Sequence, residues 1–163
     1  MNEIIVYHGG TEIVENPICK FGRKNLDFGQ GFYVTNIREQ AVKWAENMAN
    51  SRKKPALLNR YKLNREAIIR EARTKIFEAY DVEWLEFIIA NRSGENIAEG
   101  FDYVEGGVAN DRVVDTVNLY ITGLMELSTA LRELSKHQPN NQMCILNQDI
   151  ISKYLIYDGT EEL

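Results

Sequence analysis

Residues 27–33, Asp-Phe-Gly-Gln-Gly-Phe-Tyr, set two glycines one residue apart just before an extended, aromatic stretch. Glycine has no side chain, so the backbone can turn sharply there before a strand delivers Tyr33. About twenty residues earlier, His8 and Gly9 follow an apolar run at 3–7 that is typical of a buried strand. We therefore expect two strand ends to frame one pocket, in which an imidazole and bare backbone face an aromatic ring.

The composition is typical of one soluble globular domain. The chain has 163 residues, of which 44% are hydrophobic and 26% charged, so it can bury a sizeable core and we expect a single domain over 1–163. The formal net charge of −5 disfavours broad binding to a phosphate backbone, although a local basic patch could hold a dinucleotide or a nucleic-acid end. No membrane span is expected, because no apolar run is long enough to cross a bilayer.

The cysteines and the N-terminus indicate the cellular compartment. Cys19 and Cys144 are the two cysteines, and they lack the spacing of metal ligands or of a secreted disulfide framework. We expect reduced thiols and no bound metal. The N-terminus has no basic segment followed by an apolar stretch and a small-residue cleavage site. A cytoplasmic location fits both features.

Hydrophobic periodicity predicts an α+β domain, with strands near both termini and helices between them. Helices are expected at 38–48 with Asn36 as the N-cap, in the first half of 65–77, from Asp81 through Ala90, from Asn110 or Asp111 to Ile121, and at 124–136. Strands are expected at 3–7, 32–35, 56–63, the end of 65–77, 101–105, 142–146 and 153–157. A basic loop at 51–55 is expected to face solvent.

Several short motifs resemble, in order and spacing, the catalytic-domain signature of the diphtheria-toxin-like and poly(ADP-ribose) polymerase-like ADP-ribosyltransferases: His8-Gly9, Ile13 with Pro17, 28–33 and Gln40-Ala41. Nearly the whole chain also resembles a bacterial domain-of-unknown-function family, number 3990, which belongs with those transferases. That closer resemblance rests on 27–33, Gln40-Ala41 with Trp44-Ala45, Glu83-Trp84 with Asn91-Arg92, and Val104-x-Gly106 with 109–111. It implies an ADP-ribosyltransferase-like split β-sheet core with flanking and inserted helices.

The resemblance also implies a site for NAD as substrate, without a metal. Main-chain groups of Gly9 are expected to hold the nicotinamide amide, while His8 hydrogen-bonds the adenosine-side ribose and Tyr33 stacks on the nicotinamide ring. The superfamily places a glutamate at a third catalytic position, which is Gln142 here. The catalytic set is then His8, Tyr33 and Gln142. The expected cofactor-binding set is His8, Gly9, Phe28, Gly29, Gly31, Tyr33 and Trp44.

The chemistry explains why such residues would be gathered together. Cleavage of the bond between nicotinamide and ribose develops positive oxocarbenium character on the sugar, and a site can stabilise that charge much as in glycoside cleavage. A glutamate would fix a ribose hydroxyl and offset the charge. Gln142 can make the hydrogen bonds but brings only a dipole, so it is expected to be the weaker catalyst.

Each candidate also has a purely structural interpretation. The pair at 8–9 could form a turn, Gly29 and Gly31 could shape a hairpin, and Gln142 could begin a solvent-facing strand. Trp44 on an amphipathic helix could serve packing alone. Asp27, Asn110 and Asp111 are candidates to supply an acid or to orient an acceptor, although the last two could simply cap a helix.

The leading expectation for function is mono-ADP-ribosyl transfer from NAD to an unidentified macromolecule. The resemblance also allows a role as a bacterial toxin or in phage defence. A toxin role would bring a neutralising protein partner. The alternatives are a catalytically reduced NAD-binding or partner-binding module and an NAD glycohydrolase. Nucleic acid is not the favoured partner, because the chain is acidic overall.

Overall fold

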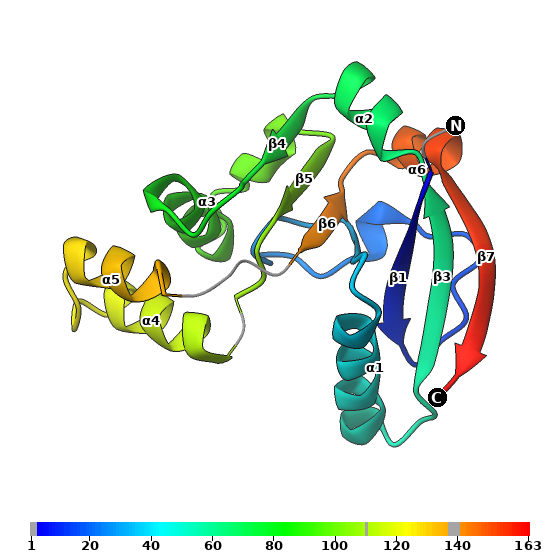
Figure 1. The fold of residues 1–163 in the computed structure, drawn as a ribbon, viewed down its shortest axis with the longest axis horizontal. Helices are drawn as coiled ribbons and strands as arrows, with labels where there is room; N and C mark the ends of the chain where they lie inside the picture. Colours follow the sequence, from blue (N-terminus) through cyan, green and yellow to red (C-terminus); the bar gives the residue numbers. More distant parts are fainter. Residues whose placement is uncertain (1–2, 110, 137–140) are drawn as a thin grey trace.

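The computed structural model describes residues 3–109, 111–136 and 141–163, which form an α and β structure with two sheets (Figure 1). The strands are β1 (Ile4–Gly10), β2 (Phe32–Val34), β3 (Leu57–Leu63), β4 (Thr74–Ile76), β5 (Tyr103–Gly106), β6 (Gln142–Ile145) and β7 (Leu155–Glu162). The helices are α1 (Arg38–Arg52), α2 (Arg65–Glu71), α3 (Val82–Arg92), α4 (Asp111–Ile121), α5 (Leu127–Leu134) and α6 (Gln148–Tyr154), with short 3₁₀ turns at Cys19–Phe21 and Ile97–Gly100.

The strands form two sheets that meet at one point. Sheet A has the order β1-β3-β7 and is antiparallel, whereas sheet B has the order β2-β6-β5-β4, with only β4 and β5 parallel. A single described bridge joins them, in which the Tyr7 N–H donates to the Thr35 carbonyl over 2.8 Å and the Thr35 N–H donates back over 3.0 Å. The pairing of β1 with the β2 segment ends beyond this bridge. We call that place the split.

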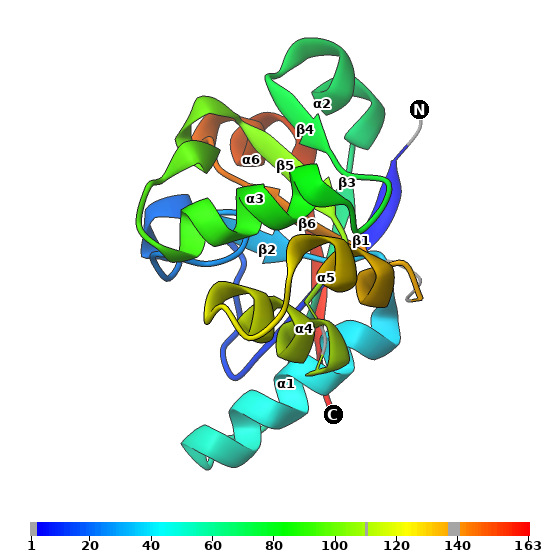
Figure 2. The ribbon, with the colours of Figure 1, turned by 90° about the vertical axis from the view of Figure 1, so that its left-hand side faces the viewer.

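Sheet B packs on both faces, because its side chains alternate between two cores. Tyr33 and its cross-strand partner Cys144 face the helical core, which α3, α4 and α5 cover (Figure 2). Phe32 and its partner Ile145 face the inter-sheet core, which β1, β3, α2 and α6 complete. A residue's place in the alternation of β2 or β6 therefore decides which side of sheet B its side chain can reach.

Most of the expected elements are present, with shifted ends. The segment 65–77 divides into a helix and a strand as expected, and the Asp81 carboxylate caps α3 by accepting from the Trp84 N–H over 2.9 Å. The N-cap expected at Asn36 is wrong: Ile37 takes that place, because the Asn36 amide oxygen instead accepts from the Asn141 side chain at 3.1 Å.

The end of one helix and the start of one strand differ from those expected. Helix α1 runs on to Arg52, so the basic loop expected at 51–55 begins only at Lys53, a left-handed C-cap with φ 55°. The connection expected between the last two strands is helix α6, capped by the Asn147 side chain, so the final strand begins at Leu155 instead of 153. Of the described helices, none has the length and apolarity that crossing a membrane requires.

Candidate functional site

The main chain of Gly9 is the first part of the candidate site. His8 and Gly9 lie inside β1, not after its end as expected, since β3 pairs with β1 up to Gly10. In an antiparallel strand each residue directs its N–H and C=O to one edge and its neighbours direct theirs to the other. Tyr7 directs both groups to Thr35, so Gly9 directs its own to the same edge, past the last described pairing with the β2 segment.

Helix α1 lies directly against Gly9 on the face of sheet A. A β-carbon at Gly9 would lie 1.9 Å from the Ala41 carbonyl oxygen and 3.0 Å from the Ala45 nitrogen, both main-chain atoms of α1. Any side chain here would push the helix away. Glycine is therefore required for the packing of α1 against β1, and its main-chain donor and acceptor are directed to the split.

His8 is held at the split by the main chain of β2. Its Nδ1 lies 2.7 Å from the Tyr33 carbonyl oxygen, and its ring centroid lies 4.5 Å from that of Phe32. A carbonyl oxygen only accepts, so Nδ1 carries the proton. Burial lowers the pKa of His8, and the hydrogen bond to Tyr33 offsets part of that effect. A neutral ring with a protonated Nδ1 presents Nε2 as an acceptor.

Tyr33 contributes a ring but not a reactive hydroxyl. The hydroxyl donates to the Gly29 carbonyl oxygen at 2.6 Å and accepts from the Phe28 N–H at 3.1 Å. Burial raises the pKa of Tyr33 far above its ordinary value. Tyr33 packs against the helical core and is partly exposed as a residue. Tyr33 and His8 meet through the Tyr33 carbonyl, while the His8 ring lies against Phe32, whose side chain leaves β2 on the opposite face.

The segment 27–31 is braced from α3. Asp27 forms an ion pair with Arg92, with 2.6 Å between Oδ1 and Nε, and the buried Asn91 amide donates to the Asp27 carbonyl at 2.9 Å. These bonds explain why Asn91-Arg92 accompanies the 27–33 motif. Asp27 is consequently engaged, and it is not the free acid considered from the sequence.

The other residues of this segment serve its close packing. Phe28 is fully buried in the helical core, so its expected place in the cofactor-binding set is wrong and its role is packing. Gly29 has φ +90°, in the left-handed region that favours glycine. Gly31 packs against β6, where a β-carbon would lie 2.5 Å from the Ile145 carbonyl oxygen. The glycines let the segment pass close to β6 before β2 begins.

Gln142 begins β6 beside the split. Its side chain leaves sheet B on the face of Cys144, the partner of Tyr33, and it is 5% exposed. The structural alternative of a solvent-facing strand start is therefore wrong. The preceding Asn141 carbonyl accepts from Thr35 Oγ1 at 2.7 Å and from Gln40 Nε2 at 3.1 Å. These bonds fix the start of β6 to the split and to α1.

Helix α1 adds two more groups. Gln40 precedes Ala41, which contacts Gly9, and its Oε1 is buried without a hydrogen-bond partner in the described part of the chain. Such an orphaned acceptor is uncommon, since most buried polar atoms are paired. Trp44, one turn further along, is partly buried and belongs to neither core cluster. Of the remaining candidates, Asn110 lies outside the described residues, and Asp111 begins α4 with a side chain that is not described.

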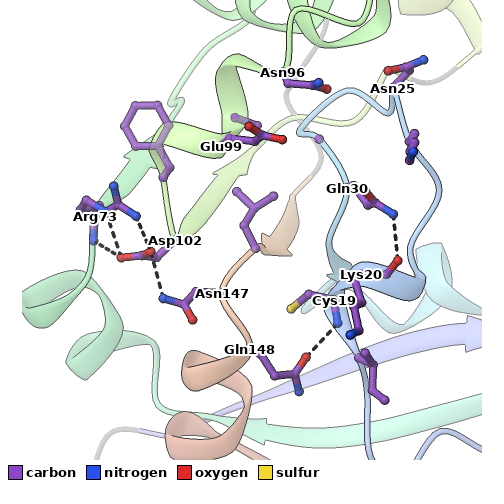
Figure 3. Close-up of a pocket in the computed structure, with 16 residues that line it drawn as sticks. Cys19, Lys20, Asn25, Gln30, Arg73, Asn96, Glu99, Asp102, Asn147 and Gln148 are labelled. Atoms are coloured by element: carbon purple, nitrogen blue, oxygen red, sulfur yellow. Dashed lines mark hydrogen bonds and ion pairs between the residues drawn. The ribbon is translucent and has the colours of Figure 1, made fainter.

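A hollow of about 920 Å³ lies elsewhere, at the far end of β6 (Figure 3). Its walls come from 18–30, 96–102 and 146–148, with Arg73 at one side. Gly29 is the only predicted site residue among those that line it. Sequence reasoning did not find this hollow, because its polar groups come from separate segments of the chain that no motif links.

The sequence motifs are thus joined in space by specific hydrogen bonds, including one from Trp84 Nε1 to the Gly107 carbonyl at 3.2 Å. A family model, described as "Protein of unknown function (DUF3990)", matches residues 4–157. The chain belongs to the DUF3990 family. No curated protein and no solved structure matches it. Within this DUF3990 chain the matched span includes β1, the segment 27–31, α1 and β6, and so all the residues of the split.

Proposed function

We propose that this DUF3990 chain binds NAD at the split and transfers ADP-ribose to a macromolecule, and that its two sheets form an ADP-ribosyltransferase-like core. The observation that carries the proposal is the main chain of Gly9, whose N–H and C=O point together to the edge of β1 where pairing with the β2 segment has ended. A carboxamide also offers one acceptor and a donor on neighbouring atoms. Nicotinamide can therefore form two hydrogen bonds with a single residue.

Three neighbouring groups support NAD as the ligand. His8 presents Nε2 as an acceptor to a ribose hydroxyl, because its Nδ1 proton is committed to Tyr33. Tyr33 is partly exposed, and its ring is the group that would stack on the nicotinamide. The buried Oε1 of Gln40 needs a donor, and a ligand amide or hydroxyl would supply one. These groups orient a dinucleotide and do not move protons, which suits a reaction driven by the loss of nicotinamide.

A second candidate is an NAD-binding module of reduced activity, and one observation favours it. Gln142 supplies no charge, and two nearby carboxylates, one before β2 and one in β5, already have partners. Asp27 is paired with Arg92, and Glu105 accepts from Arg65 at 2.6 and 2.7 Å and from the Tyr103 hydroxyl at 2.5 Å. Neither is free to stabilise an oxocarbenium ion.

Binding is tested first. NAD should raise the melting temperature of the protein, because a ligand that binds only the folded state stabilises it. Isothermal titration calorimetry should show weaker binding for His8→Ala and Gln40→Ala. Asn47→Ala is the matched control, since Asn47 is an exposed amide on the same helix. A folded protein that gives no thermal shift and no heat with millimolar NAD would rule out the NAD site.

Turnover is tested next, with labelled NAD and a host lysate. Labelled macromolecule supports transfer, nicotinamide release without labelled product indicates a glycohydrolase, and binding without release indicates the module.

Gln142→Glu should raise nicotinamide release, because it adds a charge beside the developing cation at constant side-chain size. The gain is limited by the cost of burying a carboxylate at a site that is 5% exposed. Release at the wild-type rate in Gln142→Glu and Gln142→Ala alike would remove Gln142 from the site.

A further inference from the structure

The hollow at the end of β6 adjoins the segment 27–31, to which the Tyr33 hydroxyl is hydrogen-bonded. Gly29 lines the hollow, and its carbonyl oxygen accepts from the Tyr33 hydroxyl. The volume of about 920 Å³ lies within the range of small-molecule pockets, which is roughly 300 to 1,000 Å³. The hollow is therefore large enough for a nucleotide-sized ligand, and it is separate from the split.

One wall of the hollow is fixed by an ion pair. The Arg73 guanidinium lies 3.1 Å from Asp102 Oδ1, and the Asn147 amide donates to the same oxygen at 3.2 Å (Figure 3). Burial alone would raise the pKa of Asp102, but the hydrogen bonds from Arg73 and Asn147 lower it below its usual value. Asp102 is paired with Arg73, so its charge is offset on this wall.

The opposite wall is fixed by two glutamines. Gln30 Nε2 donates to the carbonyl oxygens of Lys20 and Gly22, both at 2.8 Å, and Gln148 Oε1 accepts from the Cys19 N–H at 3.0 Å. These bonds hold the short turn at Cys19–Phe21 against the start of α6. The main chain that carries the nearest lysine is thus set in place before any ligand arrives.

Between these walls, five polar side chains have no hydrogen-bond or ion-pair partner in the described part of the chain: Lys20, Lys24, Asn25, Asn96 and Glu99. Asn25 and Asn96 lie along one rim of the hollow (Figure 3), and both adopt left-handed backbone, with φ of 60° and 54°. Asparagine is among the few residues other than glycine that adopt this region readily. Both amides are free to bind a ligand.

The charge and surface around the hollow differ from those of the whole chain. The segment 19–26 has three basic residues and no acidic one, whereas the chain has a net charge of −5. Phe101, Leu146 and Ala98 give the hollow apolar surface. Phe21 in the basic segment is 77% exposed, an unusual position for an aromatic ring.

We propose that the hollow binds a nucleoside phosphate. Lys20 and Lys24 attract the phosphate, the apolar surface contacts the base, and the amides of Asn25 and Asn96 hydrogen-bond to the edge of the base. Glu99 is placed to accept from a base amino group. Amides and carboxylates at base edges, stacking on apolar or aromatic surface and lysines at phosphates are the contacts that recognise unpaired nucleotides.

The same chemistry has two sources, a free nucleotide and an exposed nucleotide of a single strand. Phe21 follows the lining residue Lys20 in the chain, and its exposed side chain is available for stacking with a second base of a strand. The inference does not rest on NAD binding at the split, because none of His8, Gly9 and Tyr33 lines the hollow.

The test compares hollow variants with matched controls. Nucleoside 5′-monophosphates are titrated by calorimetry, and a labelled single strand of about eight nucleotides is titrated by fluorescence anisotropy at low and high salt. Asn96→Gly removes the amide and suits the left-handed backbone, and Lys24→Glu reverses a charge. Lys53→Gly is the control for the first, because Lys53 has φ 55° at the end of α1, and Lys62→Glu on β3 is the control for the second.

Each hollow variant should weaken binding by about tenfold or more, while the controls stay within about twofold of the wild type. Tighter binding of the strand than of the mononucleotides, lost at high salt, identifies a nucleic-acid ligand. Equal binding of both identifies a free nucleotide. NAD binding that is weakened by the hollow variants but not by His8→Ala supports the hollow and contradicts the split. The proposal is overturned if neither probe binds, or if binding survives both Asn96→Gly and Lys24→Glu.

Discussion

The two ends of β6 meet two different kinds of proposed site. At its start, Gln142 and Asn141 meet the split, where the proposed binding groups are main-chain atoms of Gly9 and the packing leaves no room for a methyl group. At its end, Leu146 lines an open hollow, where the free groups are side chains on loops. A site built from main-chain atoms requires a position without a side chain, such as Gly9. A site built from side chains requires particular residues at its positions.

This difference explains which site a sequence can reveal. Backbone sites need glycine at fixed positions, so they leave short motifs such as the one at 27–33. Loop side chains can change without disturbing the fold, and their positions become adjacent only in space. The comparison predicts that substitutions at the split reduce stability, and that substitutions at the hollow reduce binding alone.

The largest expected effect is that of Gly9→Ala. The new β-carbon would lie 1.9 Å from the Ala41 carbonyl oxygen, so α1 must move away from β1. We expect a loss of about 3 kcal/mol or more in the free energy of unfolding. Urea denaturation measures it.

Gly10→Ala is the matched control. Its β-carbon would meet only His8 Nε2, at 3.8 Å, which is an ordinary contact. A nearly unchanged urea midpoint is expected. If Gly9→Ala were equally mild, the packing of α1 against β1 would be looser than described and the comparison between the two ends of β6 would fail.

A smaller effect is expected for Tyr33→Phe, which keeps the ring and removes the hydroxyl. The Phe28 N–H and the Gly29 carbonyl oxygen then lose their partner. Leaving such groups unpaired costs about 1 to 3 kcal/mol. Because Gly29 also lines the hollow, nucleotide binding should weaken slightly, while stacking at the split persists.

Tyr120→Phe is the control for this change. Tyr120 packs against the same helical core, and no hydrogen bond of its hydroxyl is found among the described residues. Equal melting temperatures for both variants would show that the Tyr33 hydroxyl does not hold the segment 27–31.

Local patterns predict much of the fold and less of the site. The strand expected at 32–35 follows from alternation, and the structure has it over Phe32–Val34. The cap at Asp81 follows from a side chain that accepts a backbone N–H, and the structure has it. Asn36 fails as a cap because a distant partner, Asn141, takes its side chain. A contact across 105 positions of the chain leaves no local signal.

The same reasoning applies to the candidate residues. Gly9 is identifiable because its lack of a side chain is a local property, and its neighbour His8 follows from the motif. The engagement of Asp27 depends on Arg92 in α3, and the depth of Phe28 depends on how three helices cover sheet B. Those facts arise from tertiary packing, so the sequence could not show that Asp27 is paired or that Phe28 is buried.

Asn96→Gly should change binding with almost no change in stability. Glycine relieves the cost of φ 54°, but it also makes the unfolded chain more flexible, and each effect is at most about 1 kcal/mol. We expect a net change within about 0.5 kcal/mol. Urea denaturation of the same samples used for nucleotide titration measures it. A loss comparable to that of Gly9→Ala would mean that the hollow is a structural element and not a separate binding region.

The smallest expected effect is a dependence of stability on pH that arises from His8. Its pKa in the folded state lies below the ordinary value of 6.5, because burial disfavours the charged ring. As pH falls below 6.5, the unfolded chain gains this proton while the folded chain resists it. His8 therefore contributes its full stability above that pH and loses it as pH falls toward its lowered pKa. The urea midpoint of the wild type should decline over this window, and that of His8→Gln should decline less. Nitrogen chemical shifts of the imidazole should show a neutral ring protonated at Nδ1. A charged ring at pH 7, or identical slopes for the wild type and His8→Gln, would remove the acceptor that the split offers to a ribose hydroxyl.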